Sequence, residues 1–379
     1  MTLRGASEEI VRDALERVDP LPGTAGFAGE LDGQLVRDVL GREPLFLERA
    51  EPTEPRWAFE PATLEEPIAV PAGTALEGTD ATASADTPTV DRHWTLPTPE
   101  PVSDQATALE DLDDAIQTAH SAATAAERDI AVAFSGGVDS ALVAELLDAP
   151  LYVVGFPDSH DIEAARTAAE AMGRDLTVVD LEPADLERAV PKIVRATGRT
   201  NAMDIQIALP LYLVGERVAA DGFDALAVGQ GADELFGGYE KVVRLDHRVD
   251  AETTRGAVRE QIQSLSEQLP RDVLAIRATG LEPVAPLLHD AVVDAALRLP
   301  DDLLADEETR KRGFRQVASR YLPDDVAMRD KKAVQYGSLV AREIDRLARQ
   351  AGYKRRMDDH VDKYIASLLE DEPTTPAAE

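Results

Sequence analysis

The hexamer SGGVDS, at residues 135–140, combines two glycines, two hydroxyls and one carboxylate directly after an apolar run. An apolar helical pattern begins within it. Two glycines let a backbone approach a ligand closely, and the amides at a helix start attract an anion. Ser135 and Ser140 add hydroxyl donors, whereas Asp139 suits a phosphate-bound Mg²⁺ better than bare phosphate. The hexamer is therefore a candidate phosphate site.

A Walker loop is a different solution to phosphate binding, and it needs the pattern GxxxxGK followed by Ser or Thr. No lysine stands at that position here. A tight turn that only joins a strand to a helix is the structural alternative. The position of SGGVDS at a predicted strand–helix junction favours the ligand-binding interpretation, because open α/β sheets bind ligands at that edge.

A second glycine-rich motif, GQGADELFGGY, covers residues 229–239 and again follows a short apolar run. It contains two adjacent acids, Asp233 and Glu234. The carboxyl ends of parallel strands meet at one edge of a sheet, so we expect this loop to face the first one across a bound nucleotide.

Lysine is scarce in this chain, with seven among 39 cationic residues. Three of the seven are Lys311, Lys331 and Lys332. A chance cluster on a solvated face is one explanation. The other is a phosphate site, because a compact ammonium is a good point charge where negative charge develops.

The elements that position these motifs alternate along the chain. Helical patterns are predicted at about 105–127, 138–148, 161–172, 183–197 and 203–221, and the apolar runs DIAVAF, LYVVGF, DLTVVD and DALAVG alternate with them. Such alternation is typical of an α/β fold with a doubly wound parallel sheet. Residues 257–352 read mostly as helices with no clear strand.

The predicted domain boundaries follow changes in residue composition and in the pattern of apolar residues. Residues 1–76 read as short strands and turns, and residues 77–104 as a linker or long loop rich in Thr, Asp and Pro. Residues 105–352 form the α/β domain, and residues 353–379 a C-terminal helix and disordered acidic tail.

Composition excludes several classes of function. The formal charge of −33 makes nucleic acid an unfavourable partner. Zero cysteines exclude disulfides, thiolate zinc sites and cysteine nucleophiles. No signal peptide or apolar run of membrane-spanning length is visible, which predicts a cytoplasmic protein without membrane contact. An acid-rich, lysine-poor surface is typical of halophilic archaea, and a charged disordered protein is the alternative that the apolar periodicity disfavours.

The two motifs resemble known ones. SGGVDS resembles the pyrophosphate loop of the N-type ATP pyrophosphatases, which split ATP between the α and β phosphates. GQGADELFGGY resembles the asparagine synthetase pattern SGEGADELFGGY. Residues 271–303 and 308–332 resemble that family's GLE-x-R-x-PFLD segment and its lysine-bearing helical segment. The resemblance covers about 105–340 and implies the ATP pyrophosphatase fold with a helical C-terminal part.

By this resemblance the substrates are ATP, a carboxylate such as aspartate, and ammonia, with Mg²⁺ held by Asp139 and Asp233. Lys331 or Lys332 would stabilise the departing pyrophosphate, Lys311 would be a second phosphate ligand, and residues 335–338 would form a lid. Gln230 belongs to the predicted catalytic set. The predicted nucleotide-binding set is Phe134, Ser135, Gly136, Gly137, Val138, Asp139, Ser140, Val154, Gly155, Val228, Gly229 and Gly231.

Residues 1–76 resemble the later half of the same family's glutaminase domain, as a small β-rich remnant. That domain needs a cysteine after the initiator methionine, and Thr2 stands there instead. Threonine is an N-terminal nucleophile in other enzymes, but the segment that would build its pocket is absent. We therefore expect an ammonia-dependent ligase.

Three departures from the family pattern leave the acceptor open. Gln230 replaces a glutamate, Val284 replaces an arginine, and His289 stands near the motif's final aspartate. Another carboxylate could therefore replace aspartate. An RNA-modifying ATP pyrophosphatase and an inactive partner subunit are the remaining alternatives, and a homodimer is left open.

Overall fold

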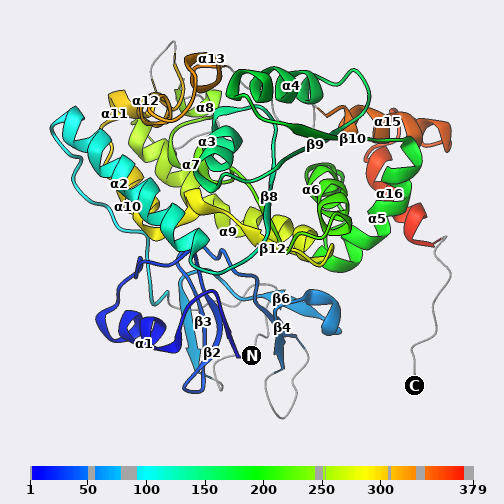
Figure 1. Ribbon diagram of the computed structural model, residues 1–379. Helices are drawn as coiled ribbons and strands as arrows, with labels where there is room; N and C mark the ends of the chain where they lie inside the picture. Colours follow the sequence, from blue (N-terminus) through cyan, green and yellow to red (C-terminus); the bar gives the residue numbers. More distant parts are fainter. Residues whose placement is uncertain are drawn as a thin grey trace.

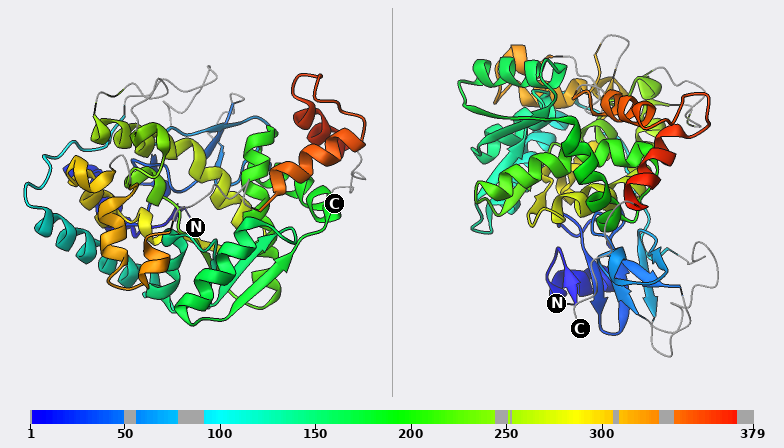
Figure 2. Two further views of the ribbon diagram at one scale, coloured as in Figure 1. Left: turned by 90° about the horizontal axis from the view of Figure 1, so that it is seen from above. Right: turned by 90° about the vertical axis from the view of Figure 1, so that its right-hand side faces the viewer.

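The computed structural model describes residues 2–49, 56–77, 92–243, 251, 253–305, 309–329 and 338–370. Figure 1 shows a helix-rich body built around a central sheet, with a smaller β-rich lobe beneath it that contains the N-terminus. The right-hand view in Figure 2 shows the same lobe below the body.

The body contains a parallel five-stranded sheet with the order β10-β9-β8-β11-β12. The strands are β8 (Ile130–Ala133), β9 (Leu151–Gly155), β10 (Leu176–Asp180), β11 (Ala225–Ala227) and β12 (Glu282–Val284). The first of these strands in the chain, β8, lies in the centre, and the order reverses between β8 and β11. Such a reversal opens a crevice at the carboxyl ends of the two strands, where open α/β sheets bind ligands.

Helices cover both faces of this sheet, as the alternating side chains of β8 require. Val132 packs in one cluster with Leu142 of α3 (Val138–Leu147), on the face that α2 (Gln105–Thr124) also covers. Its neighbour Ala131 packs in the other cluster with Leu209 of α6 (Ala202–Ala220), on the face of α5 (Pro183–Thr197). The predicted doubly wound α/β fold is confirmed.

The other helices of the body follow the crossovers and form its C-terminal part. They are α4 (His160–Met172), α7 (Ala232–Leu235), α8 (Glu240–Val243), α9 (Thr254–Arg277), the 3-10 helix η2 (Pro286–Leu288), α10 (Asp290–Leu297), α11 (Asp301–Leu304), α12 (Arg312–Ala318), α13 (Asp324–Ala327), α15 (Val340–Gln350) and α16 (His360–Glu370).

The N-terminal lobe holds two antiparallel sheets, with the orders β1-β2-β3-β7 and β5-β4-β6. Its elements are β1 (Leu3–Arg4), α1 (Glu8–Arg17), β2 (Ala28–Leu31), β3 (Gln34–Arg37), β4 (Phe46–Glu48), β5 (Trp57–Ala58), the 3-10 helix η1 (Pro61–Thr63), β6 (Pro67–Ala69) and β7 (Thr74–Glu77). Trp94, from the segment after β7, closes one core of the lobe by packing edge-on against Phe27, with ring centroids 5.5 Å apart.

Two elements differ from the sequence-based expectation. The segment 257–352 does contain a strand, because β12 pairs in parallel with β11 at the edge of the sheet. It is three residues long with a central proline, which only an edge strand tolerates, so it gives no strand pattern. In the lobe, the prediction of strands and turns is wrong for α1, a helix that Ser7 caps by accepting a hydrogen bond from the amide of Ile10 at 3.3 Å.

A buried arginine joins the lobe to the body. The guanidinium of Arg42 lies 2.8 Å from Asp38 of the lobe and 2.7 Å from Asp290 at the start of α10. It also donates to the carbonyl oxygen of Leu288 at 2.7 Å. Arg42 is 4% exposed, and the two carboxylate side chains are at most 1% exposed. A second pair, between Arg277 of α9 and Glu43, lies beside it at 2.8 Å.

Candidate active site

The turn between β8 and α3 carries the first motif. Gly136 has a φ of +72°, and a Cβ there would lie 2.5 Å from the carbonyl oxygen of Ala164. Gly137 is the N-cap of α3, and it offers no capping side chain. The start of α3 therefore presents its amides and its positive dipole end to a bound anion. The Ser140 hydroxyl accepts from the amide of Ser135 at 3.2 Å and fixes the turn.

The loop after β11 lies against this turn. A Cβ at Gly229 would lie 2.7 Å from both the carbonyl carbon of Asp139 and the amide nitrogen of Ser140. These backbone atoms could make room for a Cβ only if the loop moved, so glycine is required where the two loops meet. Gly231 has a φ of +93° and starts α7. The two predicted motifs therefore face each other at the reversal of the strand order.

Three charged groups meet at this edge. The ammonium nitrogen of Lys311 lies 2.8 Å from each carboxylate oxygen of Asp139 and 2.5 Å from Oδ1 of Asp233. Lys311 is 4% exposed, and the Asp139 side chain is 3% exposed. Two carboxylates from different loops thus converge on one point, which is the arrangement that a divalent cation on a triphosphate needs. In this respect the residues fit the predicted Mg²⁺.

A cavity of about 220 Å³ opens beside these loops. Ten predicted residues line it: Phe134, Ser135, Asp139, Ser140, Val154, Val228, Gly229, Gln230, Gly231 and Asp233. The apolar face of α6 supplies Leu211 and Val214 opposite them. The other predicted residues with described positions, Gly136, Gly137, Val138, Gly155 and Lys311, are not part of the cavity lining. A cavity lined by apolar side chains together with glycine-loop and carboxylate groups suits a nucleotide.

Sequence reasoning missed a buried acid–phenol pair. The hydroxyl of Tyr239 donates to Glu234 at 2.5 Å, and Glu234 lines the cavity. Burial raises the pKa of Glu234, although the hydrogen bond from Tyr239 opposes the shift. Burial also raises the pKa of Tyr239. Glu234 and Tyr239 are both part of the motif GQGADELFGGY, but the sequence does not show that their side chains are in contact.

A second network that the sequence did not reveal holds Gln230. Its amide donates to Asp272, which also accepts from Arg271 at 2.7 Å. The guanidinium of Arg271 also forms an ion pair with Asp204, with Nη1 and Oδ1 2.8 Å apart. Burial raises the pKa of Asp272, while the charge of Arg271 lowers it. Asp272 lies inside the long helix α9, where one acid among many gives no sequence signal.

Comparison with known proteins decides the family. The asparagine synthase family model matches residues 111–277 and 246–374, which together are more than half of the chain. The chain belongs to the asparagine synthase family. It is 30% identical over 271 residues to a protein of Methanocaldococcus jannaschii named as a candidate glutamine-hydrolysing asparagine synthetase. That alignment covers 62% of this chain and 50% of the relative.

A second member of the asparagine synthase family, the glutamine-hydrolysing asparagine synthetase B of Escherichia coli, is 24% identical over 347 residues. The alignment covers 84% of this chain and 61% of the relative, so it reaches into the N-terminal lobe. The chain thus spans about half the length of the relatives it matches. A solved tRNA thiolase from Methanococcus maripaludis is 13% identical with a TM-score of 0.29, and covers 71% of this chain and 82% of its own.

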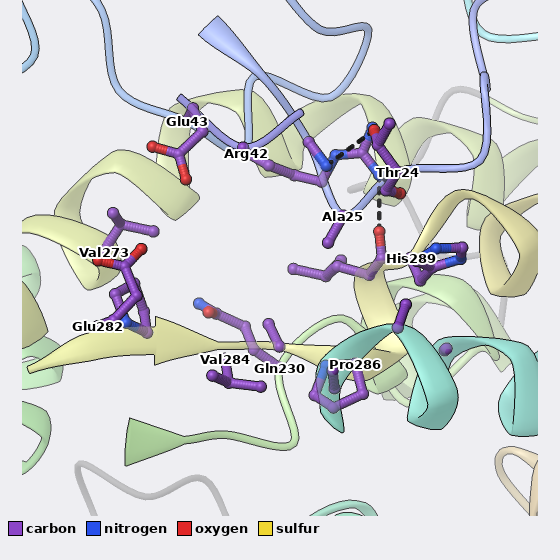
Figure 3. A pocket seen from close by; sticks show the side chains of 18 of the residues that line it. Thr24, Ala25, Arg42, Glu43, Gln230, Val273, Glu282, Val284, Pro286 and His289 are labelled. Carbon is purple, nitrogen blue, oxygen red and sulfur yellow. Dashed lines mark hydrogen bonds between the residues drawn. The ribbon is translucent and has the colours of Figure 1, made fainter. Parts of the chain in front are cut away.

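The three departures from the asparagine synthase pattern share one location. Gln230, Val284 and His289 line a second cavity, of about 360 Å³, between the lobe and the sheet (Figure 3). Its opposite wall comes from the lobe and includes Thr24 and Arg42. Val228 and Gln230 line both cavities, so the second adjoins the nucleotide cavity. Burial lowers the pKa of His289, whose Nδ1 accepts from the amide of Ala291 at 3.2 Å.

Some of the residues predicted to be functional in this chain lie outside the described residues. Lys331, Lys332 and residues 335–337 of the predicted lid are among them, so their roles stay predictions. Among the residues that the structure does describe, no three His, Cys, Asp or Glu side chains gather as a metal cluster. No helix in that same part of the chain is long and apolar enough to cross a bilayer.

Proposed function

We propose that the protein is an ATP-dependent amide ligase that forms asparagine from aspartate and ammonia. A carboxylate oxygen of aspartate attacks the α-phosphorus of ATP, the bond to the β-phosphate breaks, and pyrophosphate leaves. The ammonia nitrogen then attacks the acyl carbon, the bond to AMP breaks, and the nitrogen loses a proton. The observation that carries this proposal is the pair of glycine loops that face each other between β8 and β11.

The residues divide the work by position. The turn at residues 135–137 and the start of α3 bind phosphate oxygens, because their amides and dipole favour negative charge. The nucleoside part lies along Val154 and the α6 face. Asp139 and Asp233 hold Mg²⁺, which supplies positive charge against the triphosphate when bound. This arrangement mainly orients the reactants and balances developing charge.

Ammonia is the nitrogen source that we infer, because the chain has no cysteine for a glutaminase. Product formation should follow the ammonium concentration. Release of glutamate in step with asparagine, when the purified chain is given glutamine alone, would contradict the inference.

A second candidate function rests on the larger cavity. Gln230, Val284 and His289 line it, and all three differ from the asparagine synthetase pattern. Gln230 replaces a glutamate and Val284 replaces an arginine, and His289 adds an imidazole near the motif's final aspartate. This favours, as the alternative, a carboxylate other than aspartate in the same two-step reaction.

The deciding experiment is ATP–[³²P]pyrophosphate exchange in molar KCl across a panel of carboxylates that includes aspartate. We expect exchange to require one carboxylate and to be nearly abolished in Asp139→Asn and Asp233→Asn. Asp148→Asn is the matched control, since Asp148 ends the same helix α3 and is 95% exposed. Exchange that survives both active-site substitutions with unaltered Mg²⁺ dependence would refute the assignment of the two carboxylates.

A further inference from the structure

Lys311 occupies the point on which the two candidate metal carboxylates converge. Its ammonium contacts both oxygens of Asp139 at 2.8 Å and Oδ1 of Asp233 at 2.5 Å. A buried ammonium between two carboxylates is well compensated, whereas either carboxylate near the other without a cation is costly. Lys311 thus satisfies the same electrostatic requirement as a metal ion would.

The backbone around Lys311 is placed so that its side chain can reach this position. Lys311 has a φ of +57° and stands directly before α12. That helix is fixed against the second motif by Phe314, which stacks on Phe236 with ring centroids 4.7 Å apart. The lysine stem crosses Gly238, where a Cβ would lie 2.5 Å from Lys311 Cε and 2.1 Å from Asp233 Oδ1. Gly238 therefore lets the lysine reach both carboxylates.

An ammonium and a Mg²⁺ cannot both occupy the point where these oxygens converge. Mg²⁺ binds carboxylate oxygens at about 2.0–2.1 Å. An ion so close to oxygens that also contact the ammonium at 2.5–2.8 Å would meet strong repulsion between two buried cations. A Mg²⁺ that both carboxylates bind at this point therefore requires the ammonium to move.

We propose that Lys311 is an exchangeable cation of the magnesium site. Without nucleotide it holds Asp139 and Asp233 together, and it leaves them when Mg²⁺ enters with ATP. The four-carbon stem of lysine is flexible enough for this exchange. The displaced ammonium then remains beside a new negative charge, the triphosphate. The inference rests on the proposed function, because it takes Asp139 and Asp233 as Mg²⁺ ligands.

Manganese binding without nucleotide tests the exchange directly. Free Mn²⁺ is counted by electron paramagnetic resonance during titration of the wild type, Lys311→Met and Lys311→Gln, with folding checked by circular dichroism. Both variants should bind Mn²⁺ at least about tenfold more tightly than the wild type, because the competing cation is gone. Lys192→Met is the matched control for charge, since Lys192 is 43% exposed and pairs with Glu216 away from these loops. Its Mn²⁺ affinity should equal that of the wild type.

The double variant Asp139→Asn, Lys311→Met assigns the binding to this site, and it should lose the tighter affinity. Folded Lys311→Met or Lys311→Gln protein with wild-type or weaker Mn²⁺ affinity would overturn the exchange but leave the two carboxylates as ligands. If the double variant keeps the tighter affinity, the Mn²⁺ binds elsewhere, and the assignment of Asp139 in the proposed function also falls.

Discussion

Arg42→Met should detach the N-terminal lobe from the body. The substitution keeps most of the apolar stem of Arg42 but removes the contacts to Asp38, Asp290 and the Leu288 carbonyl. Both carboxylates then remain buried without their shared cation. Removing one partner of a buried ion pair typically costs about 3–5 kcal/mol. That is a large share of the ~5–15 kcal/mol that stabilises an ordinary domain.

The distribution of aromatic residues provides an assay that separates the two parts. Both tryptophans, Trp57 and Trp94, belong to the lobe and the segment packed on it. Tryptophan fluorescence therefore reports the lobe, whereas far-ultraviolet circular dichroism is dominated by the helices of the body. In urea, the fluorescence transition of Arg42→Met should move to lower denaturant by an amount equivalent to about 3–5 kcal/mol, ahead of the helical transition.

Arg17→Met is the control for this measurement. Arg17 is also in the lobe, but its side chain is 75% exposed and its pair with Asp13 lies at 3.2 Å on the surface. Such a pair contributes about 0–1 kcal/mol. A fluorescence transition of Arg42→Met that shifts no more than that of Arg17→Met would refute the reasoning, since the buried charges would then carry no net cost.

Three further predictions concern the nucleotide loops, the C-terminal helices and the lysine pair. Gly229→Ala should lower ATP affinity by at least about tenfold, because its Cβ would meet the backbone of Asp139 and Ser140 at 2.7 Å; equilibrium ATP binding measures this, and wild-type affinity would contradict it. Arg355, with a smaller contribution from His360, lowers the pKa of Asp345 to about 2. The ionised Asp345 carboxylate therefore stabilises the fold fully above about pH 4, and this stabilisation is lost as the pH falls toward 2. The melting temperature of Asp345→Asn should therefore be below that of the wild type at neutral pH, and the difference should narrow as the pH falls. A difference that does not change with pH would show that ionisation of Asp345 is not linked to stability. Lys331→Ala should reduce kcat by about 10²–10³-fold with little change in ATP affinity, and Lys332→Ala less, whereas full activity of the double variant would assign both to a solvated face.

Sequence reasoning succeeded where local patterns carried the signal. The strands β8 to β11 are short apolar runs between helical patterns, and the glycines at their ends mark the loops. Lys311 stood out because lysine is rare in the chain, and the structure places it against Asp139. The roles of these residues in catalysis remain predictions.

The missed features depend on tertiary contacts. β12 owes its strand conformation to pairing with β11, and its own residues, Glu-Pro-Val, do not favour one. Asp272 reaches Gln230 only because α9 packs beside α7. The larger cavity is formed by the lobe and the body together, so neither segment alone could have indicated it.

The contacts of Lys311 with Asp139 and Asp233 join residues that the ribosome makes at different times. Lys311 follows Asp139 by 172 residues. At a ribosomal rate of about 5–20 residues per second, the lysine emerges roughly 10–35 s after the first carboxylate. Every strand of the parallel sheet has been translated by then, since β12 ends at Val284. A nascent chain can thus pair its strands before Lys311 brings its positive charge to Asp139 and Asp233.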